Sequence, residues 1–291
     1  MESEISARHV QHSLFKTLWW YKLKRNPMTS IGLVILLIIV VSVIFAPLLT
    51  PYHPTKIDIV EKFSPPSFTH WFGTDEVGRD ILTRILYGGR LSLGVGILTI
   101  VVAGAIGLFI GSLSGYFGGL VDQIIMRMMD MMLAFPMLIL AMALSAALGP
   151  SLQNALLALI IVEIPVYVRL ARGQALILRQ SLYVKSAISF GLRPVYIIMR
   201  HIIPNVVSSL IIQATLDVGG VILMIATLGF LGLGAQPPTP EWGAMISVGW
   251  KYLLDYWWYP VFPGLFLFLS AAALNLIGDG MRDILDPRSG R

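Results

Sequence analysis

The chain has 291 residues, of which 56% are hydrophobic and only 13% are charged, with a formal net charge of +5. Soluble domains usually carry about 25% charged residues, so this composition and its long uncharged runs exclude an ordinary soluble domain and indicate an integral membrane protein. The sequence contains no cysteine, which excludes disulfides, thiolate metal sites and cysteine nucleophiles.

The N-terminal segment, residues 1–30, is predicted to be a basic cytoplasmic tail. Its Lys and Arg residues outnumber Glu2 and Glu4. Its apolar and aromatic residues suit either a membrane surface or a solvated tail, and the sequence favours neither. Residues 31–49 form the first predicted span, because helical residues rise about 1.5 Å each and a hydrocarbon core is about 30 Å thick.

Residues 50–90 are predicted to be a polar outer loop. Prolines keep its first half extended. In its second half Val77, Ile81 and Ile85 recur every four residues, which indicates an amphipathic helix lying against membrane or protein.

Residues 91–117 form the second predicted span, which carries a stripe of small residues. Gly107, Gly111 and Gly115 recur every four residues. Such a stripe lets another helix approach closely, so we expect a helix-packing face here.

Four further spans are predicted at about residues 126–148, 154–168, 206–233 and 259–277. An outer segment precedes the last of them, where we expect Thr239 to cap a helix that starts at Pro240. A short tail, residues 279–291, ends the chain. Six spans place both termini on one side, and this topology puts 15 Lys and Arg residues inside against 6 outside. That imbalance favours cytoplasmic termini.

Residues 169–205, between the fourth and fifth spans, are basic and contain neither Asp nor Glu. Such a loop is expected on the cytoplasmic side. Ser181 can cap a short helix whose apolar face includes Leu182, Ala187, Ile188 and Phe190. Gly191 suits the left-handed end of that helix, Pro194 suits the first turn of a second helix, and Pro204 is expected to stop it. We call residues 181–204 the knob.

Ionisable groups inside membrane spans are costly, and two carboxylates in the predicted spans are candidates for a translocation path. Glu163 could line a translocation path or pair with Arg169, and pairing is the favoured interpretation. Asp217 is equally consistent with a pore-facing site and with a buried, hydrogen-bonded carboxylate.

Several catalytic patterns are absent from the sequence. It has no Gly-Lys pair and hence no G-x-x-x-x-G-K-[ST] phosphate loop, no H-E-x-x-H motif, and no metal-ligand spacing among its five histidines. We therefore expect no catalytic residues, no metal and no cofactor bound by this chain.

The knob resembles the EAA loop of importer permeases driven by separate ATP-hydrolysing subunits. Its pattern is Glu-Ala-Ala, three residues, Gly, nine residues, then Ile-x-Leu-Pro. This chain has Lys185-Ser186-Ala187, three residues, Gly191, nine residues, then His201-Ile202-Ile203-Pro204, so the spacing is intact and the Glu is replaced by Lys.

Residues 72–80, 229–243 and 275–287 extend the resemblance. With the knob they look like the second permease subunit of dipeptide, oligopeptide or nickel ABC importers. The resemblance implies an all-α, six-helix type I importer fold, with residues 31–278 as the transmembrane permease domain. It implies that the ATPase-coupling residues are Lys185, Ser186, Ala187, Gly191, Arg193, Arg200, His201 and Pro204.

The resemblance also implies a heteromeric machine in a bacterial inner membrane. The implied partners are a homologous permease, two ATP-binding subunits that hold ATP and magnesium, an extracytoplasmic binding protein and membrane lipid, but no nucleic acid. Peptides are the expected substrate. Glutathione-like peptides and nickel chelates are alternatives. An ion-driven secondary carrier that uses Glu163 and Asp217 is the alternative from another class.

Overall fold

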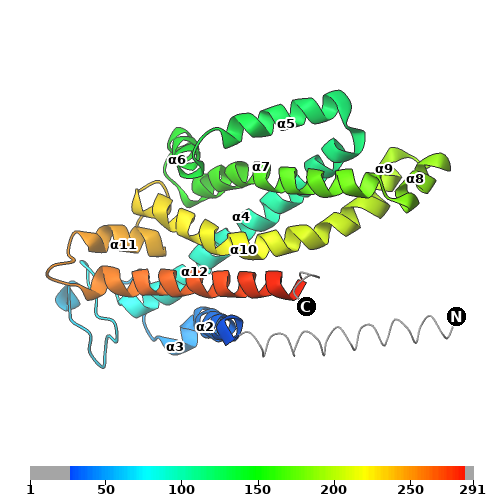
Figure 1. Ribbon diagram of the computed structural model, residues 1–291. Helices are drawn as coiled ribbons and strands as arrows, with labels where there is room; N and C mark the ends of the chain where they lie inside the picture. The colour runs from blue at the N-terminus through cyan, green and yellow to red at the C-terminus, as the bar shows by residue number, and fades with distance from the viewer. Residues whose placement is uncertain (1–26, 286–291) are drawn as a thin grey trace.

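The computed structural model describes residues 27–285, so the predicted segment 1–26 and the last part of the predicted tail, 286–291, lie outside the described part. The described residues contain helices, turns and one isolated bridge between Thr74 and Asp80, without a strand, which confirms the all-α class. The elements, shown in Figure 1, are α2 Pro27–Ile44, α3 Ala46–Leu49, η1 Ile59–Glu61, α4 Ile81–Phe117, α5 Gly119–Leu133, α6 Met137–Leu148, α7 Leu152–Arg179, α8 Leu182–Ser189, α9 Pro194–Ile197, η2 Ile198–Ile202, α10 Ile203–Phe230, α11 Trp242–Trp250 and α12 Trp258–Leu285.

Five helical stretches of the described chain are long and apolar enough to cross a membrane, and a sixth candidate is the pair α5 and α6. The third predicted span, residues 126–148, is not one straight helix. The chain bends by 90° between α5 and α6. Pro136 stands at the bend and lacks the amide hydrogen that a continuous helix would need there, which explains why an apolar run in the sequence becomes two helices.

Two helices extend past the predicted span ends. The predicted amphipathic segment and the second span are one helix, α4, whose start is capped by Asp80 through a 2.7 Å bond from the Thr83 amide. The fourth span continues from residue 168 to Arg179, so α7 passes through Pro165 without ending. Proline is tolerated inside transmembrane helices because neighbouring helices and local adjustments satisfy the freed backbone groups.

The closest packing lies between α4 and α7, at the glycine stripe. A Cβ added at Gly115 would stand 2.7 Å from Cβ of Ala175, and one at Gly111 would stand 2.7 Å from Cβ of Ala171. Gly107 lies in the same way against Tyr167. Real side chains cannot adopt such distances, so the three glycines let the two helices approach closely.

The outer loop is folded against the helix ends by buried charges. The guanidinium of Arg79 donates to the buried carboxylate of Asp75 at 2.6 Å. Arg84 on α4 donates to the carbonyls of Pro54, at 3.0 Å, and Pro238, at 3.3 Å. Residues 50–80 are therefore fixed to α4 and to the connection before α11.

The residue that caps α11 is Glu241, and not Thr239 as the sequence suggested. Its fully buried carboxylate accepts from the amides of Gly243, at 2.9 Å, and Ala244, at 2.8 Å, and from the hydroxyl of Ser92 at 3.1 Å. Burial raises the pKa of this carboxyl above its usual value, against the effect of those three donors. Glu241 thus joins α11 to α4.

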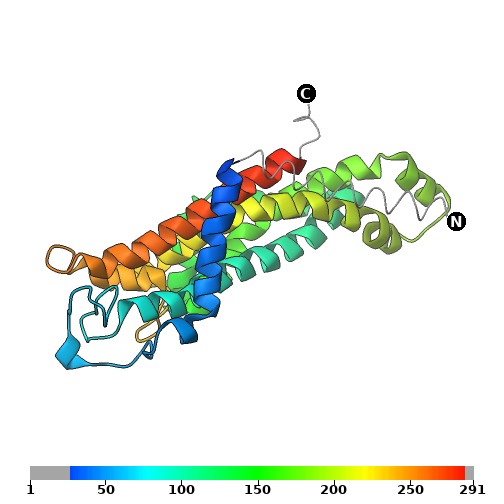
Figure 2. The same cartoon turned by 90° about the horizontal axis from the view of Figure 1, so that it is seen from below.

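The knob and the outer loop lie at opposite ends of an elongated helix bundle. In Figure 1 the helices α8 and α9 stand at one end, while α11 and residues 50–80 stand at the other. Figure 2 shows α2 crossing obliquely over the bundle, where it packs mainly on α12. α4, α7 and α10 connect the two ends.

Candidate functional site

The knob is a short helix–turn–helix that joins the C-terminal end of α7 to the N-terminal end of α10. Gly191 ends α8 with φ +75°, the left-handed conformation that glycine adopts at least cost. The Gly191 amide donates to the carbonyl of Ile188 at 2.9 Å, and the Leu192 amide donates to that of Ala187 at 3.2 Å. These two bonds form a Schellman motif, which satisfies carbonyls that the helix end would otherwise leave unpaired.

Two predicted features at the helix ends of the knob, the cap at Ser181 and the stop at Pro204, differ from expectation. Ser181 is the N-cap residue of α8, but its hydroxyl donates to the Leu178 carbonyl at 2.6 Å and makes no capping bond. Pro204 does not stop the second helix. The chain passes from α9 through the π-helical turn η2 into α10, and Pro204 is in the first turn of α10, where its missing amide hydrogen costs nothing.

One face of the knob is packed into the bundle. Val184 and Ala187 of α8 are buried in the same apolar cluster as Ile197 of α9, Ile202 of η2 and Ala175 of α7. Ala187 therefore points inward, whereas the other residues predicted on the same apolar face, Leu182, Ile188 and Phe190, are exposed. This packing fixes the knob to α7 and α10, so that a force on the knob reaches both helices.

The other face of the knob is exposed, apolar and basic. Leu182 and Phe190 are 84% and 85% exposed. The remaining predicted coupling residues lie mostly beside them: Lys185, Ser186, Gly191, Arg193 and Arg200 are exposed, and His201 is half-buried between the rings of Tyr183 and Tyr196. Of the predicted coupling residues, Ala187 points inward and Pro204 lies in the first turn of α10, while the others lie on α8, η2 and the turn between α8 and α9.

Asp217 is a hydrogen-bonded carboxylate between two spans. It accepts from the hydroxyl of Tyr167 on α7 and from the side-chain amide of Gln213 on α10, each at 2.8 Å. Glu163 is 4% exposed and lies one turn before Tyr167 on α7. Asp217 is half-buried on α10, so the two candidate path residues lie on the neighbouring helices α7 and α10, near the bond between Tyr167 and Asp217.

The favoured pairing of Glu163 with Arg169 is wrong. Arg169 bonds to Asp130 of α5 at 2.8 Å. Six residues along a helix turn two side chains to different faces, whereas ion pairs on one helix need spacings of three or four. The nearest acid for Arg169 is therefore on another helix.

A stronger ion pair, which the sequence reasoning missed, holds α5 to α7. Arg172 donates to both carboxylate oxygens of Asp122, at 2.5 and 2.7 Å, and the hydroxyl of Ser114 donates to the same carboxylate at 2.6 Å. Bidentate pairs of this kind are the strong ones. The sequence does carry a signal for such pairs: Asp122 and Asp130 lie eight residues apart in one apolar segment, and Arg169 and Arg172 lie three residues apart in another.

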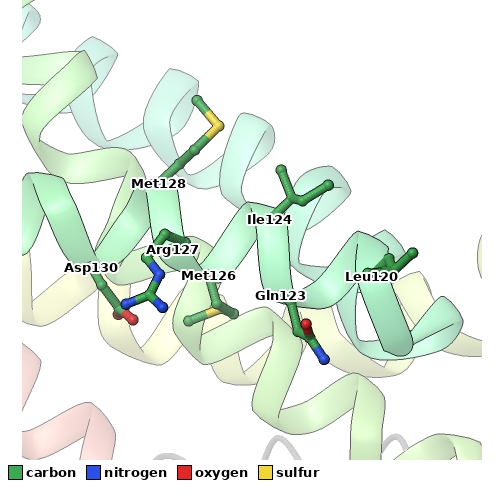
Figure 3. A pocket seen from close by; sticks show the side chains of 7 residues that line it. All are labelled: Leu120, Gln123, Ile124, Met126, Arg127, Met128 and Asp130. Atoms are coloured by element: carbon green, nitrogen blue, oxygen red, sulfur yellow. The ribbon is translucent and has the colours of Figure 1, made fainter.

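Most of α5 is exposed in the single chain. A hollow of about 660 Å³ lies along this helix, with a lining drawn entirely from α5: Leu120, Gln123, Ile124, Met126, Arg127, Met128 and Asp130. In Figure 3 the side chains of Arg127 and Asp130 lie on one side of the helix, and that of Met128 points to the other. Met129 is the one α5 residue that is buried.

The described residues contain no group of His, Asp and Glu side chains that could hold a metal ion. The arrangement is thus a helix bundle with a protruding knob at one end and an exposed, methionine-rich helix, α5.

Comparison with known proteins gives two family matches. Residues 107–291 match the model of the binding-protein-dependent transport system inner membrane component, and residues 13–66 match the N-terminal transmembrane domain of oligopeptide transport permease C. Among curated proteins, the chain is 52% identical to a probable D,D-dipeptide transport system permease protein of Escherichia coli K12, over 94% of this chain and 92% of the relative.

Two further relatives are similar over nearly the whole chain. The dipeptide transport system permease protein of Alkalihalophilus pseudofirmus is 45% identical, over 92% of this chain and 88% of the relative. The glutathione transport system permease protein of Escherichia coli O6:K15:H31 is 41% identical, over 96% of this chain and 93% of the relative.

Proposed function

Because the chain belongs to the family of binding-protein-dependent transport system inner membrane components, and is thus a multi-pass permease of an ABC importer, we propose that it carries peptides inward. We propose dipeptides as the substrate class, because two relatives are named as dipeptide permeases. Glutathione-like peptides are the second candidate, since a glutathione permease is also similar.

The knob is the observation that carries the coupling role. It has the spacing of the EAA loop, it is packed rigidly onto α7 and α10, and its outer face is exposed and basic. A rigid attachment of this kind can transmit a rigid-body shift to the two spans joined to it. We propose that ATP-binding subunits contact the knob and that closure of the ATPase pair changes the access of the path.

The remaining features of the proposed machine follow from this role. The chain itself performs no catalysis, and ATP and magnesium bind to two partner subunits. A homologous permease covers the open face of α5, and an extracytoplasmic binding protein delivers the peptide to the end formed by α11 and residues 50–80. Both termini lie in the cytoplasm, which places the basic knob on the same side.

The cluster of Glu163, Tyr167 and Asp217 is proposed to line or support the translocation path. The family gives an ion-driven secondary carrier no support, so these carboxylates need no role in ion coupling. The hydrogen bonds that Tyr167 and Gln213 donate to Asp217 suit a polar site between α7 and α10.

Reconstitution tests the proposal. Proteoliposomes that contain the chain, its second permease and its ATPase subunits should take up a labelled dipeptide when ATP and the loaded binding protein are present. A variant ATPase that binds but does not hydrolyse ATP should abolish sustained uptake. Uptake by this chain alone, driven by an ion gradient, would refute the proposal.

A further inference from the structure

Another hollow lies at the end of the bundle that carries the outer loop, where the end of α3, this loop and the start of α4 meet. Its volume is about 330 Å³. The lining comes from three separate parts of the chain, within residues 49–52, 68–71 and 80–82, and includes the rings of Tyr52, Phe68 and Trp71. In Figures 1 and 2 α3 lies beside the outer loop. Three elements of the fold thus form this hollow, whereas the hollow along α5 is lined by one helix.

The hollow stands at the level where a membrane surface would meet the bundle. Phe72, which follows the lining residue Trp71, stacks its ring on that of Phe262 with 4.1 Å between the centroids. Phe262 lies one turn after Trp258, the first residue of α12. Exposed tryptophans gather at this level, since Trp71 is 66% exposed and Trp257 is 52% exposed. Aromatic belts of this kind mark the boundary between the hydrocarbon core and the lipid headgroups.

An exposed apolar face leads along α2 and α3 to the hollow. Its residues recur every three or four positions and are 43% to 82% exposed: Val34, Ile38, Val41, Phe45 and Leu48. From residue 27 to residue 49 the two helices carry no charged residue and extend over about 34 Å, enough for a hydrocarbon core about 30 Å thick. A face of this length and composition is suited to lipid chains. It ends next to Leu49, which belongs to the lining of the hollow.

The hollow also contains a carboxylate. Among the described residues that line it, Asp80 alone is charged, and it is 5% exposed. Its oxygens lie 2.9 Å from Nδ1 of His70 and accept from the amide and the hydroxyl of Thr83 at 2.7 and 2.6 Å. No ion pair within residues 27–285 joins Asp80 to a Lys or Arg. A carboxylate beside aromatic rings favours a cationic ligand, because an ammonium is attracted both to the charge and to the ring faces.

We propose that this hollow binds the ammonium headgroup of a phospholipid from the membrane leaflet beside the outer loop, with the acyl chains along the exposed face of α2. Asp80 supplies the charge, and Phe68 and Trp71 supply exposed ring faces. Leu49 contacts the start of the acyl chains. Phosphatidylethanolamine and phosphatidylcholine carry such a headgroup, whereas phosphatidylglycerol does not. The inference goes beyond the proposed function, since it concerns the lipid around the permease and not the peptide that passes through it.

Protection of a single cysteine tests the site. Thr69 is exposed and lines the hollow, so Thr69→Cys in this cysteine-free chain places a thiol beside the proposed headgroup. The full complex, with both permeases and the ATPase subunits but without binding protein, is placed in three kinds of nanodisc. Each contains the same fraction of phosphatidylglycerol, and the remainder is phosphatidylethanolamine, phosphatidylcholine or the uncharged, amine-free lipid monoglucosyldiacylglycerol. The rate at which an uncharged maleimide labels this chain is measured in each.

The expected result is slower labelling with either ammonium lipid. Relative to the glucolipid, both should slow the labelling of Thr69→Cys by about fivefold, because ~1 kcal/mol of attraction between an ammonium and an aromatic ring corresponds to that factor. Val60→Cys is the matched control, since Val60 is 93% exposed on the same loop and is not part of the lining. Its labelling rate should be equal in all three membranes.

Two substitutions separate the charge from the rings. Asp80→Asn removes the charge but keeps a favourable N-cap for α4, and it should abolish the difference between the lipids. Trp71→Leu keeps an apolar side chain but removes the ring face, and it should reduce that difference. Assembly of the variant complexes, followed by size-exclusion chromatography, checks that both proteins fold.

Three results would overturn the proposal. One is equal labelling of Thr69→Cys in the three membranes, and another is protection that either substitution leaves undiminished. The third is protection that appears only after the binding protein is added, which would assign the hollow to a protein contact. The measurement involves no transport, so a failure of ATP-driven dipeptide uptake would refute the proposed function without changing these labelling rates.

Discussion

Replacement of Gly191 by valine should uncouple ATP hydrolysis from uptake. Gly191 has φ +75°, and a Cβ at this position would meet no atom within 4 Å, so the effect comes from the backbone and not from a clash. The left-handed conformation costs an ordinary L-residue about 1–2 kcal/mol, and a β-branched residue rarely adopts it. Relaxation of φ would instead break the bonds that Gly191 and Leu192 donate to α8, each with a net value of about 0.5–1.5 kcal/mol.

Backbone strain and loss of these bonds would each raise the free energy of the knob conformation that binds the partner by about 1–2 kcal/mol. This corresponds to roughly a 5- to 30-fold loss of affinity for the partner. The assay compares ATP-dependent dipeptide uptake with the amount of permease in the membrane. Gly191→Asn should retain more uptake, since Asn tolerates the left-handed region. Gly173→Val, in α7 and with equally open surroundings, is the control without positive φ. Undiminished uptake by Gly191→Val at wild-type membrane levels would refute the reasoning.

Three further predictions concern packing, the α5 ion pair and the outer cap. Gly111→Leu should destabilise the protein by at least 1–3 kcal/mol through overpacking against α7, seen as a lower Tm in detergent, whereas Gly94→Leu, with no atom within 4 Å, should not. Arg172→Ala removes the ion pair with Asp122 and should make α5 more mobile. A single cysteine introduced at Ile124 of this cysteine-free chain should then react faster with a maleimide. An unchanged rate would show that the ion pair does not hold the helix. The pKa of Glu241 is raised in the folded protein, so protonation of this carboxyl stabilises the fold below its ordinary pKa of 4.5, and that stability is lost as the pH rises through the folded pKa. Glu241→Gln should therefore flatten the fall in Tm above pH 4.5. An equal slope in both proteins would contradict this prediction.

The sequence predicted two features that depend on the backbone preference of a single residue, although the local predictions for Ser181, Pro204 and Thr239 were wrong. Gly191 and Pro194 have the backbone positions expected of them, because a positive φ and a first helical turn are preferences of single residues. The stripe at Gly107 indicated a close approach, but the choice of α7 as its partner depends on tertiary packing, which hydropathy does not encode.

The sequence could not predict which charges meet across helices. Asp122 and Arg172 are fifty residues apart, and Glu163 and Arg169 looked paired only because they are close in sequence. The same limit applies to α5 and α6, where apolarity predicted one span at residues 126–148 but gave no information about the 90° bend. Contacts between helices follow from packing geometry, and a single sequence gives no direct signal of that geometry.

The unbroken length of α4 has a consequence for how motion crosses the membrane. Its 37 residues form a rod about 55 Å long that starts beside the outer loop and ends beside Tyr116, which belongs to the same buried cluster as the knob. Three glycines clamp this rod to α7. A tilt of about 5° around its centre would move each end by about 2.4 Å in opposite directions. A tilt that begins at the knob end of α4 would therefore also move Arg84 and the carbonyls of Pro54 and Pro238 to which it is bonded, without local rearrangements along the helix.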